Sequence, residues 1–154
     1  MDAISSYVTL EEAQCYFDLR LYSEAWQTAS RQTRIQALST ATTLLEEIPW
    51  LGRRESENQE FEWPRILKRD GDAEFPKNIK KACYELALNL LSNETVLDQE
   101  TERIKRVRSA KTEVEFFEDI DSARVFPSRV MDLLDPYIDF SRWPGRTVEV
   151  WRFN

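Results

Sequence analysis

The stretch PKNIKKACYELALNLL, residues 76–91, decides the fold of this chain. Its apolar residues recur at intervals of three and four, which is the spacing of one face of an α-helix. That face comprises Ile79, Cys83, Leu86 and Leu90. Between Ala82 and Leu91 nearly every side of the helix is apolar, and Pro76 suits a first helical turn. We therefore expect a central, buried helix that begins near Pro76.

A second helix is expected before this stretch, from about Ser30 to Glu47. An apolar stripe at the same spacing predicts it, and the stripe consists of Ile35, Leu38, Ala41, Leu45 and Ile48. Pro49 ends the helix, because a proline disfavours helical backbone angles in the residue before it.

The N-terminal part predicts a further helix that begins after Thr9. Thr9 can cap this helix, and Glu12, three residues later, can complete a capping box. Apolar residues then recur at helical spacing, at Leu10, Ala13, Phe17 and Leu21. After a break near residues 22–23, residues 24–29 predict one or two more helical turns.

Residues 103–118 predict a β-hairpin, because two short stretches rich in Val, Ile and Phe flank a tight connection. The first stretch is basic and the second acidic. Their charged residues are Arg103, Lys105, Arg106, Arg108, Glu113, Glu115 and Glu118. Opposite charges across paired strands contribute about 0.2–1 kcal/mol each, which favours self-pairing of the hairpin. The alternative is that copies of the chain meet edge to edge, basic strand against acidic strand.

Two elements are predicted near the C-terminus. Residues 127–135 predict a short helix that Pro136 closes, and its inward residues are Val130, Leu133 and Leu134. Residues 147–153 alternate as a strand, whose apolar residues are Val148, Val150, Trp151 and Phe153. Because chain ends are normally polar and frayed, a terminal strand with these residues is expected to dock on a partner.

These patterns predict a single, mainly α domain over residues 1–154, a bundle of about four to five helices with a small antiparallel β element. The bundle core is assigned to residues 9–100, followed by the hairpin, the short helix and a docking strand at 147–154. With 154 residues, of which 42% are hydrophobic, the chain can bury one sizeable core and is too short for two comfortable domains.

The net charge of −7 disfavours a protein whose whole surface binds nucleic acid, although a local basic patch stays open. The first twenty residues lack a basic segment followed by an apolar run. No run of eighteen apolar residues occurs anywhere in the chain. We expect a soluble, intracellular protein with no membrane partner.

Catalytic and metal-binding patterns are nearly absent. The chain has no histidine, and both Cys15 and Cys83 fall in helical patterns that predict small buried apolar residues. Some carboxylates could hold a divalent cation, but alternation on a strand and turn favours a solvent-facing role; they are Glu113, Glu115, Asp119 and Asp121. We expect no enzymatic activity, no cofactor and no metal.

The loop of residues 49–65 is a candidate recognition surface, because tryptophans and cations alternate within and just beyond it. These residues are Trp50, Arg53, Arg54, Trp63, Arg65, Lys68 and Arg69. Aromatic side chains that stack on bases, together with cations, are typical of single-strand binders. A tryptophan beside a helix end also commonly covers the core, and we favour this packing role for both tryptophans. The acidic run 55–62 is interpreted as a solvated loop face.

Four segments carry a family resemblance: YVTLEEA at 7–13, IPWLGRR at 48–54, WPR at 63–65 and FP at 75–76. Their order, with the strand pair, the final helix and the terminal strand, resembles the head-to-tail connectors of tailed bacteriophages. These are also called adaptor or head-completion proteins. The resemblance covers about residues 7–153. Some relatives are labelled DnaT-like single-stranded DNA-binding proteins, which we take as the weaker functional name.

This resemblance implies a structural protein of the virion neck, assembled in the cytoplasm of the host bacterium. Copies of the chain would form a ring, expected to be a dodecamer, beneath the portal protein. The ring would extend the DNA channel, through which DNA passes without sequence-specific binding. It would also dock the next neck or tail protein.

The connector hypothesis assigns Arg53, Arg54 and Arg65 to contacts with a neighbouring subunit or the portal. The charged hairpin residues and the apolar residues of the terminal strand complete the candidate interface. The alternative is a single-stranded DNA-binding accessory protein that uses Trp50, Trp63 and the arginines. A monomeric regulator is a third class.

Overall fold

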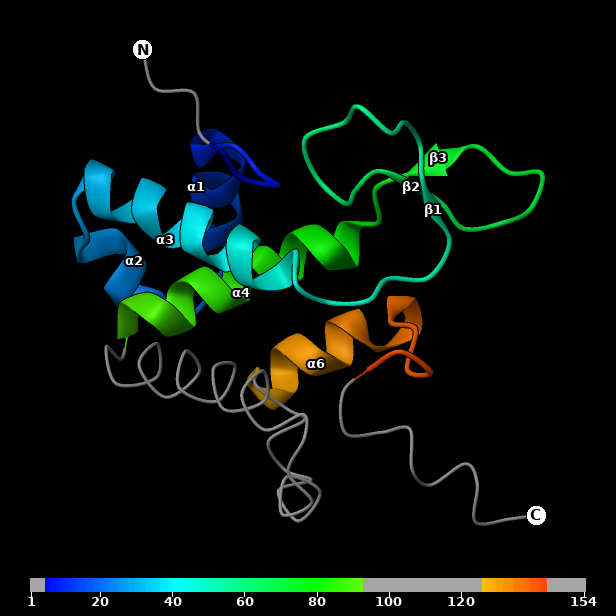
Figure 1. The fold of residues 1–154 in the computed structure, drawn as a ribbon. Coiled ribbons are helices and arrows are strands. Elements are labelled where there is room, and N and C mark those ends of the chain that lie inside the picture. The colour runs from blue at the N-terminus through cyan, green and yellow to red at the C-terminus, as the bar shows by residue number, and fades with distance from the viewer. Residues whose placement is uncertain (1–4, 93–125, 144–154) are drawn as a thin grey trace, which may run out of the picture.

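Figure 1 shows the computed structural model of the chain, which describes residues 5–92 and 126–143. The helices are α1 (Leu10–Asp18), α2 (Glu24–Thr28), α3 (Arg31–Leu45), α4 (Lys77–Ser92), α6 (Ser128–Leu134) and the 3-10 helix η3 (Asp135–Tyr137). The strands are β1 (Arg53–Arg54), β2 (Arg65–Ile66) and β3 (Ala73–Glu74). The protein is mainly α with a small antiparallel sheet, which confirms the predicted fold class. The hairpin predicted at 103–118 and the strand predicted at 147–153 lie outside the described residues.

Helix α4 is the centre of the molecule, as its apolar sequence predicts. It packs against α3 on one side and α6 on the other, and it also contacts α2. Five of its residues have no exposed surface: Ile79, Ala82, Cys83, Leu86 and Ala87. Burial of a large apolar side chain contributes about 1.5–3 kcal/mol, so this helix supplies much of the stabilisation of the core.

One exception interrupts the apolar surface of α4. Glu85 is buried, and its carboxylate pairs with Arg20 at 2.7 Å and with Arg129 at 3.3 Å while accepting a bond from the hydroxyl of Tyr16. Burial alone would raise the pKa of Glu85, but the bonds from Arg20 and Tyr16 and the charge of Arg129 outweigh it and lower the pKa. Burial and the bond to Glu85 raise the pKa of Tyr16 to about 12.

Helix α1 begins as the capping box predicts and ends earlier than its apolar spacing predicts. The Thr9 hydroxyl accepts a bond from the Glu12 amide at 3.0 Å, and the Glu12 carboxylate accepts one from the Thr9 amide at 2.9 Å. The helix stops at Asp18, so the prediction that Leu21 continues its apolar face is wrong, and Leu21 is 76% exposed. The Ser23 hydroxyl donates to a carbonyl of the last turn, where the chain reverses.

Helix α3 confirms the second predicted helix to within two residues at its end. Ser30 caps it by accepting a bond from the Thr33 amide at 3.1 Å. The predicted stripe is buried apart from Ile35, which is half-buried. After Leu45 the chain turns and reaches Pro49 in a non-helical conformation. The end of α3 therefore delivers the 49–65 loop directly beside the core.

The small sheet forms in the segment that the sequence analysis treated as loop. Its strands are antiparallel in the order β1-β2-β3, with Arg54 opposite Arg65 and Arg65 opposite Glu74. Each strand has two residues, which is too short for an alternating pattern to be visible. In Figure 1 the sheet lies at one end of the molecule and α2 at the other.

The C-terminal described segment joins the 49–65 loop. Trp50 forms an isolated antiparallel bridge with Ile138, and the Asp139 amide donates to the Pro49 carbonyl at 2.8 Å. Pro136 was predicted to close the short helix. Helix α6 ends two residues before it, at Leu134, and Pro136 lies inside η3, because a proline is tolerated in the first turn of a new helical segment. This pairing brings the residues after η3 to the sheet end of the molecule.

The two cysteines differ in burial. Cys83 is fully buried, as expected, and burial raises the pKa of its thiol to about 11. Cys15 is exposed, so its predicted burial is wrong: Ala13 and Phe17 supply the inward face of α1, and Cys15 lies off it. None of the helices in the described ranges is both long and apolar enough to span a membrane.

Candidate nucleic-acid interface

The two tryptophans of the loop are core residues. Trp50 is 1% exposed and Trp63 is 2% exposed, and their rings meet edge to face with centroids 5.3 Å apart. Trp63 also contacts Tyr137, with ring centroids 5.9 Å apart. The packing role that the sequence favoured is confirmed. Neither ring presents a face on which a nucleotide base could stack.

Arg65 holds the loop together from the inside. It is 6% exposed, and its guanidinium donates to the carbonyls of Leu51 at 2.8 Å and Gly52 at 2.7 Å. It also forms an ion pair with Glu62 at 2.7 Å. The assignment of Arg65 to an outward contact is therefore wrong, because a side chain this buried and this fully bonded is occupied within the loop.

Gly52 allows the loop to cross β2 at close range. Its φ angle is +75°, a backbone conformation that favours glycine, and a Cβ atom at this position would lie 2.4 Å from the Ile66 carbonyl oxygen. The chain can therefore place the Gly52 carbonyl against Arg65 only because this residue has no side chain. The glycine of the motif Trp-Leu-Gly-Arg-Arg is therefore required by the path of the backbone at this position.

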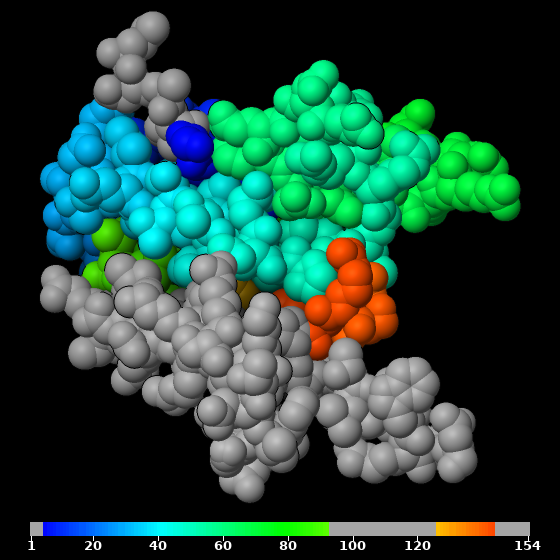
Figure 2. Space-filling model, viewed as in Figure 1, coloured from blue at the N-terminus to red at the C-terminus, as the bar shows by residue number. Residues whose placement is uncertain are grey.

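Five cations occupy the surface of this end of the molecule, and we call this set the basic surface. Its members are Arg53, Arg54, Lys68, Arg69 and Arg142. The loop between β2 and β3, which carries Lys68 and Arg69, projects from the body as the green lobe of Figure 2. Among the residues that the structure describes, no carboxylate forms an ion pair with Arg53, Lys68 or Arg69.

Three guanidinium groups are close enough to influence one another. The pKa of Arg65 is lowered first by burial, and the charges of Arg142 and Arg54 lower it further, while Glu62 raises it. Arg142 is 58% exposed at its side chain, and it donates to the Trp50 carbonyl at 2.7 Å and pairs with Asp139 at 2.8 Å. The positive charge of β1 and β2 is thus continued by a residue far away in the sequence.

Acidic side chains border the basic surface. Glu55, Glu57 and Glu60 are exposed in the connection between β1 and β2, as the interpretation of a solvated acidic run predicts. They would repel a nucleic-acid backbone from that side, because phosphates are anionic. The β2–β3 loop also carries the exposed carboxylates of Asp70 and Asp72, so the positive charge of the basic surface is concentrated at β1, Lys68, Arg69 and Arg142.

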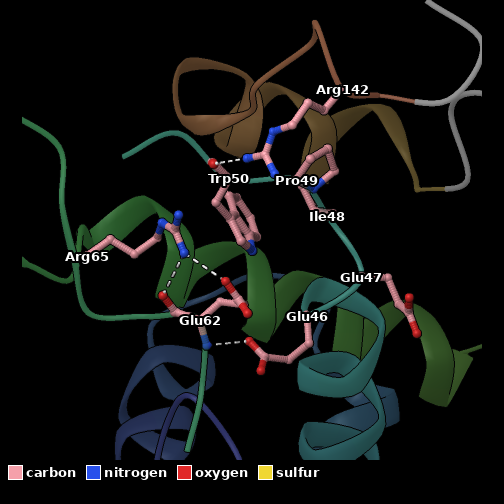
Figure 3. Close-up of a pocket in the computed structure, with 8 residues that line it drawn as sticks. All are labelled: Glu46, Glu47, Ile48, Pro49, Trp50, Glu62, Arg65 and Arg142. Carbon is pink, nitrogen blue, oxygen red and sulfur yellow. Dashed lines mark hydrogen bonds and ion pairs between the residues drawn. The ribbon is translucent and has the colours of Figure 1, made fainter. Parts of the chain in front are cut away.

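A polar pocket of about 370 Å³ lies beside the basic surface. Figure 3 shows its lining residues: Glu46, Glu47, Ile48, Pro49, Trp50, Glu62, Arg65 and Arg142. The Glu46 carboxylate accepts a bond from the Glu62 amide at 2.9 Å and another from the hydroxyl of Tyr7. The indole Nε1 of Trp50 is buried and has no hydrogen-bond partner. The pocket thus combines carboxylate acceptors with N–H donors.

Within residues 5–92 and 126–143, no group of three or more metal-ligating side chains comes together. The carboxylates considered for a divalent cation lie outside the described residues. So do the charged residues of the predicted hairpin (Arg103, Lys105, Arg106, Arg108, Glu113, Glu115 and Glu118). The apolar residues of the predicted terminal strand (Val148, Val150, Trp151 and Phe153) lie outside the described residues as well. Of the predicted contacts, Arg53 and Arg54 lie together on β1.

Sequence reasoning missed two features of this end. Arg142 lies 92 residues from the Trp50 carbonyl that it contacts, and no local pattern links the two. The burial of Arg65 was also missed. Its partners include the backbone carbonyls of Leu51 and Gly52, which lie 14 and 13 residues away and have no sequence signature.

The fold and this surface define a small, mainly α protein whose sheet end offers clustered cations and a polar pocket. The model of the family described as "Putative DnaT-like ssDNA binding protein" matches residues 2–152, nearly the whole chain. The protein belongs to this family. Comparison with curated proteins and with solved structures gives no match.

The family match corrects the resemblance drawn from the sequence. The order of the four segments was interpreted as that of phage head-to-tail connectors, and the family that matches is the DnaT-like one instead. The neck role, the ring, and the portal and tail partners are not supported and are withdrawn. Two of the four segments, 48–54 and 63–65, are explained by packing, since Trp50, Trp63, Gly52 and Arg65 form one loop structure.

Proposed function

We propose that the protein is a single-stranded DNA-binding accessory protein without catalytic activity, and that it holds the phosphate backbone on the basic surface. The observation that carries the proposal is the family match over residues 2–152. The five clustered cations support it, because phosphate contacts supply most of the affinity of sequence-tolerant binding. This function is the alternative that the sequence left open, with different binding residues.

The binding residues differ because Trp50 and Trp63 are buried. Contact with a strand falls instead to Arg53, Lys68 and Arg69, which have no ion-pair partner in the described structure, and to Arg54 and Arg142 beside them. A protein with a net charge of −7 repels DNA over the rest of its surface. Binding should therefore be local, of modest affinity and strongly dependent on salt.

The salt dependence of affinity tests the proposal. For single strands the slope of log K against log salt is about −0.7 for each phosphate neutralised, so five contacts predict about −3.5. Between about 50 and 200 mM salt the affinity for labelled oligo(dT) should fall by about 100-fold. Fluorescence anisotropy of the labelled oligonucleotide measures this without requiring a tryptophan signal.

An oligonucleotide that fails to bind at low salt would contradict the proposal. Binding that does not weaken as salt rises would contradict the phosphate-contact mechanism. Arg31 supplies the control, because it is an exposed arginine at the start of α3, away from the sheet (Figure 1). Arg31→Ala should leave both the affinity and the salt slope unchanged.

A further inference from the structure

The basic surface explains how a backbone is held, but it does not distinguish a single strand from a duplex. We infer that the pocket lined by Glu46, Glu62, Trp50 and Arg142 receives the Watson–Crick edge of one unpaired base that carries an exocyclic amino group. This inference rests on the proposed function for its class of ligand. It adds a site of base recognition to a surface of phosphate contacts.

The first observation is a donor without an acceptor. Trp50 is 1% exposed, and its Nε1 has no hydrogen-bond partner although buried polar groups are normally paired. Figure 3 shows the indole nitrogen turned toward the side of the pocket where Glu46 and Glu62 lie. This nitrogen is covered by the surrounding side chains, so a base carbonyl or ring nitrogen would supply the missing acceptor when those side chains move aside.

The second observation is an excess of acceptors in the same pocket. One oxygen of Glu46 accepts bonds from Tyr7 and from the Glu62 amide, and one oxygen of Glu62 pairs with Arg65. Each carboxylate has a second oxygen that can accept a bond. Carboxylates of proteins take the amino group of cytosine in this way. Thymine would present a carbonyl oxygen at that position, and two acceptors facing each other repel.

The remaining walls suit a single ring attached to a strand. Ile48 and Pro49 provide an apolar side, and a volume of about 370 Å³ lies at the small end of ligand pockets. Arg142 lines the pocket and also belongs to the basic surface, so the phosphate of an inserted nucleotide would meet a cation. A paired base cannot enter, because its Watson–Crick edge is occupied in a duplex.

Oligo(dC) and oligo(dT) of about 12 nucleotides, a length within the usual site sizes, give the test, because their backbones are identical. The protein should bind oligo(dC) about tenfold more tightly, in line with the discrimination of one good base contact. The variant E46Q/E62Q keeps an oxygen for the bonds to Tyr7, the Glu62 amide and Arg65 while removing both charges. It should lose the preference for oligo(dC) without weakening oligo(dT). Weakening of both oligonucleotides together would indicate a structural role and overturn the inference.

A second measurement addresses the pocket without a strand. In ¹⁵N spectra, cytidine should shift the indole N–H resonance of Trp50, and thymidine should shift it less. The indole of Trp63 is equally unpaired and does not line the pocket, so its resonance is the internal control. Absence of a Trp50 shift together with equal binding of oligo(dC) and oligo(dT) overturns the inference and leaves the proposed function intact. If no oligonucleotide binds, the proposed function fails, and the cytidine shift alone decides the pocket.

Discussion

The α3–α4 core and the sheet end of the molecule are stabilised in different ways. Helices α3 and α4 pack through apolar side chains that repeat along each helix, and the main polar group buried between helices is the paired Glu85. The sheet end has strands of two residues each, and its shape depends on Arg65, whose guanidinium bonds two loop carbonyls and Glu62. The core is held by many similar contacts, and the sheet end by a few specific ones.

Because of this difference, the loss of one contact should affect the two regions differently. The apolar side chains of the core are shared between α3, α4 and α6, so loss of one of them lowers the stability of the whole fold. In the sheet end, loss of one specific contact should loosen a region locally, because few other contacts hold the same backbone. The cations of the basic surface lie on this second region. Their arrangement therefore depends on Arg65 and Gly52 more than on the helices.

The largest effect on stability is expected from Leu86→Ala at the centre of α4. The side chain has no exposed surface, and a cavity of this kind costs about 3–4 kcal/mol in the free energy of unfolding. Urea denaturation measures the change, and Lys81→Ala on the exposed side of the same helix is the control. A change below about 1 kcal/mol for Leu86→Ala would contradict the central position of α4.

Arg65→Ala should have a slightly smaller effect and lower the free energy of local opening of the sheet end by about 2–3 kcal/mol, because two loop carbonyls and Glu62 lose a charged partner. Hydrogen exchange measured by NMR should show faster exchange at β1 and β2 and unchanged protection in α4. Arg53→Ala, on the neighbouring strand and exposed, should change neither. A uniform loss of protection in α4 and the sheet would show that the two regions unfold as one unit.

Gly52→Ala should lower the free energy of unfolding by about 2 kcal/mol, because alanine is strained at a φ of +75° and its Cβ would collide with the Ile66 carbonyl. The matched control is Gly71→Ala. Gly71 has no positive φ, and a Cβ atom there would make a tight contact of 3.1 Å with the Lys68 Cβ atom instead of colliding with a backbone oxygen at 2.4 Å. Thermal unfolding should separate the two variants clearly, and equal destabilisation would contradict the described path of the loop.

The smallest effect concerns the one charged cluster of the described helical core. The pKa of Glu85 is lowered in the folded state, so its contribution is fully present above the ordinary value of 4.5 and is lost as pH falls through the folded pKa. The difference in unfolding free energy between the native protein and Glu85→Gln should therefore shrink below about pH 4.5. A difference that stays constant from pH 7 to about pH 3 would contradict the charged pairing of Glu85.

The same contrast explains which parts of the fold could be predicted from sequence. Helices α3 and α4 and the Thr9 capping box depend on residues three or four apart, and their patterns are visible in the chain. The strands around Arg54 and Arg65 have no period to detect, and their partners are backbone carbonyls. The burial of Glu85 depends on Arg20 and Arg129, which lie on other elements.

The candidate site was predicted only in part for the same reason. Arg53 and Arg54 were selected because they stand beside a tryptophan in a non-helical segment, and the structure places both on β1. The tryptophans themselves pack inward, so their use as stacking surfaces could not be decided before the fold was known. Arg142 joins the basic surface through contacts across the chain, which no local pattern shows.

The central claim is that the sheet end holds single-stranded DNA through exposed cations. The most direct measurement compares the affinity of R53A/K68A/R69A and of Arg31→Ala for labelled oligo(dT), by fluorescence anisotropy over a range of salt concentrations. The triple variant should bind far more weakly, and its salt slope should be smaller in magnitude by about 2, since three phosphate contacts are removed. Arg31→Ala should match the native protein. Native affinity and slope in the triple variant would contradict the claim.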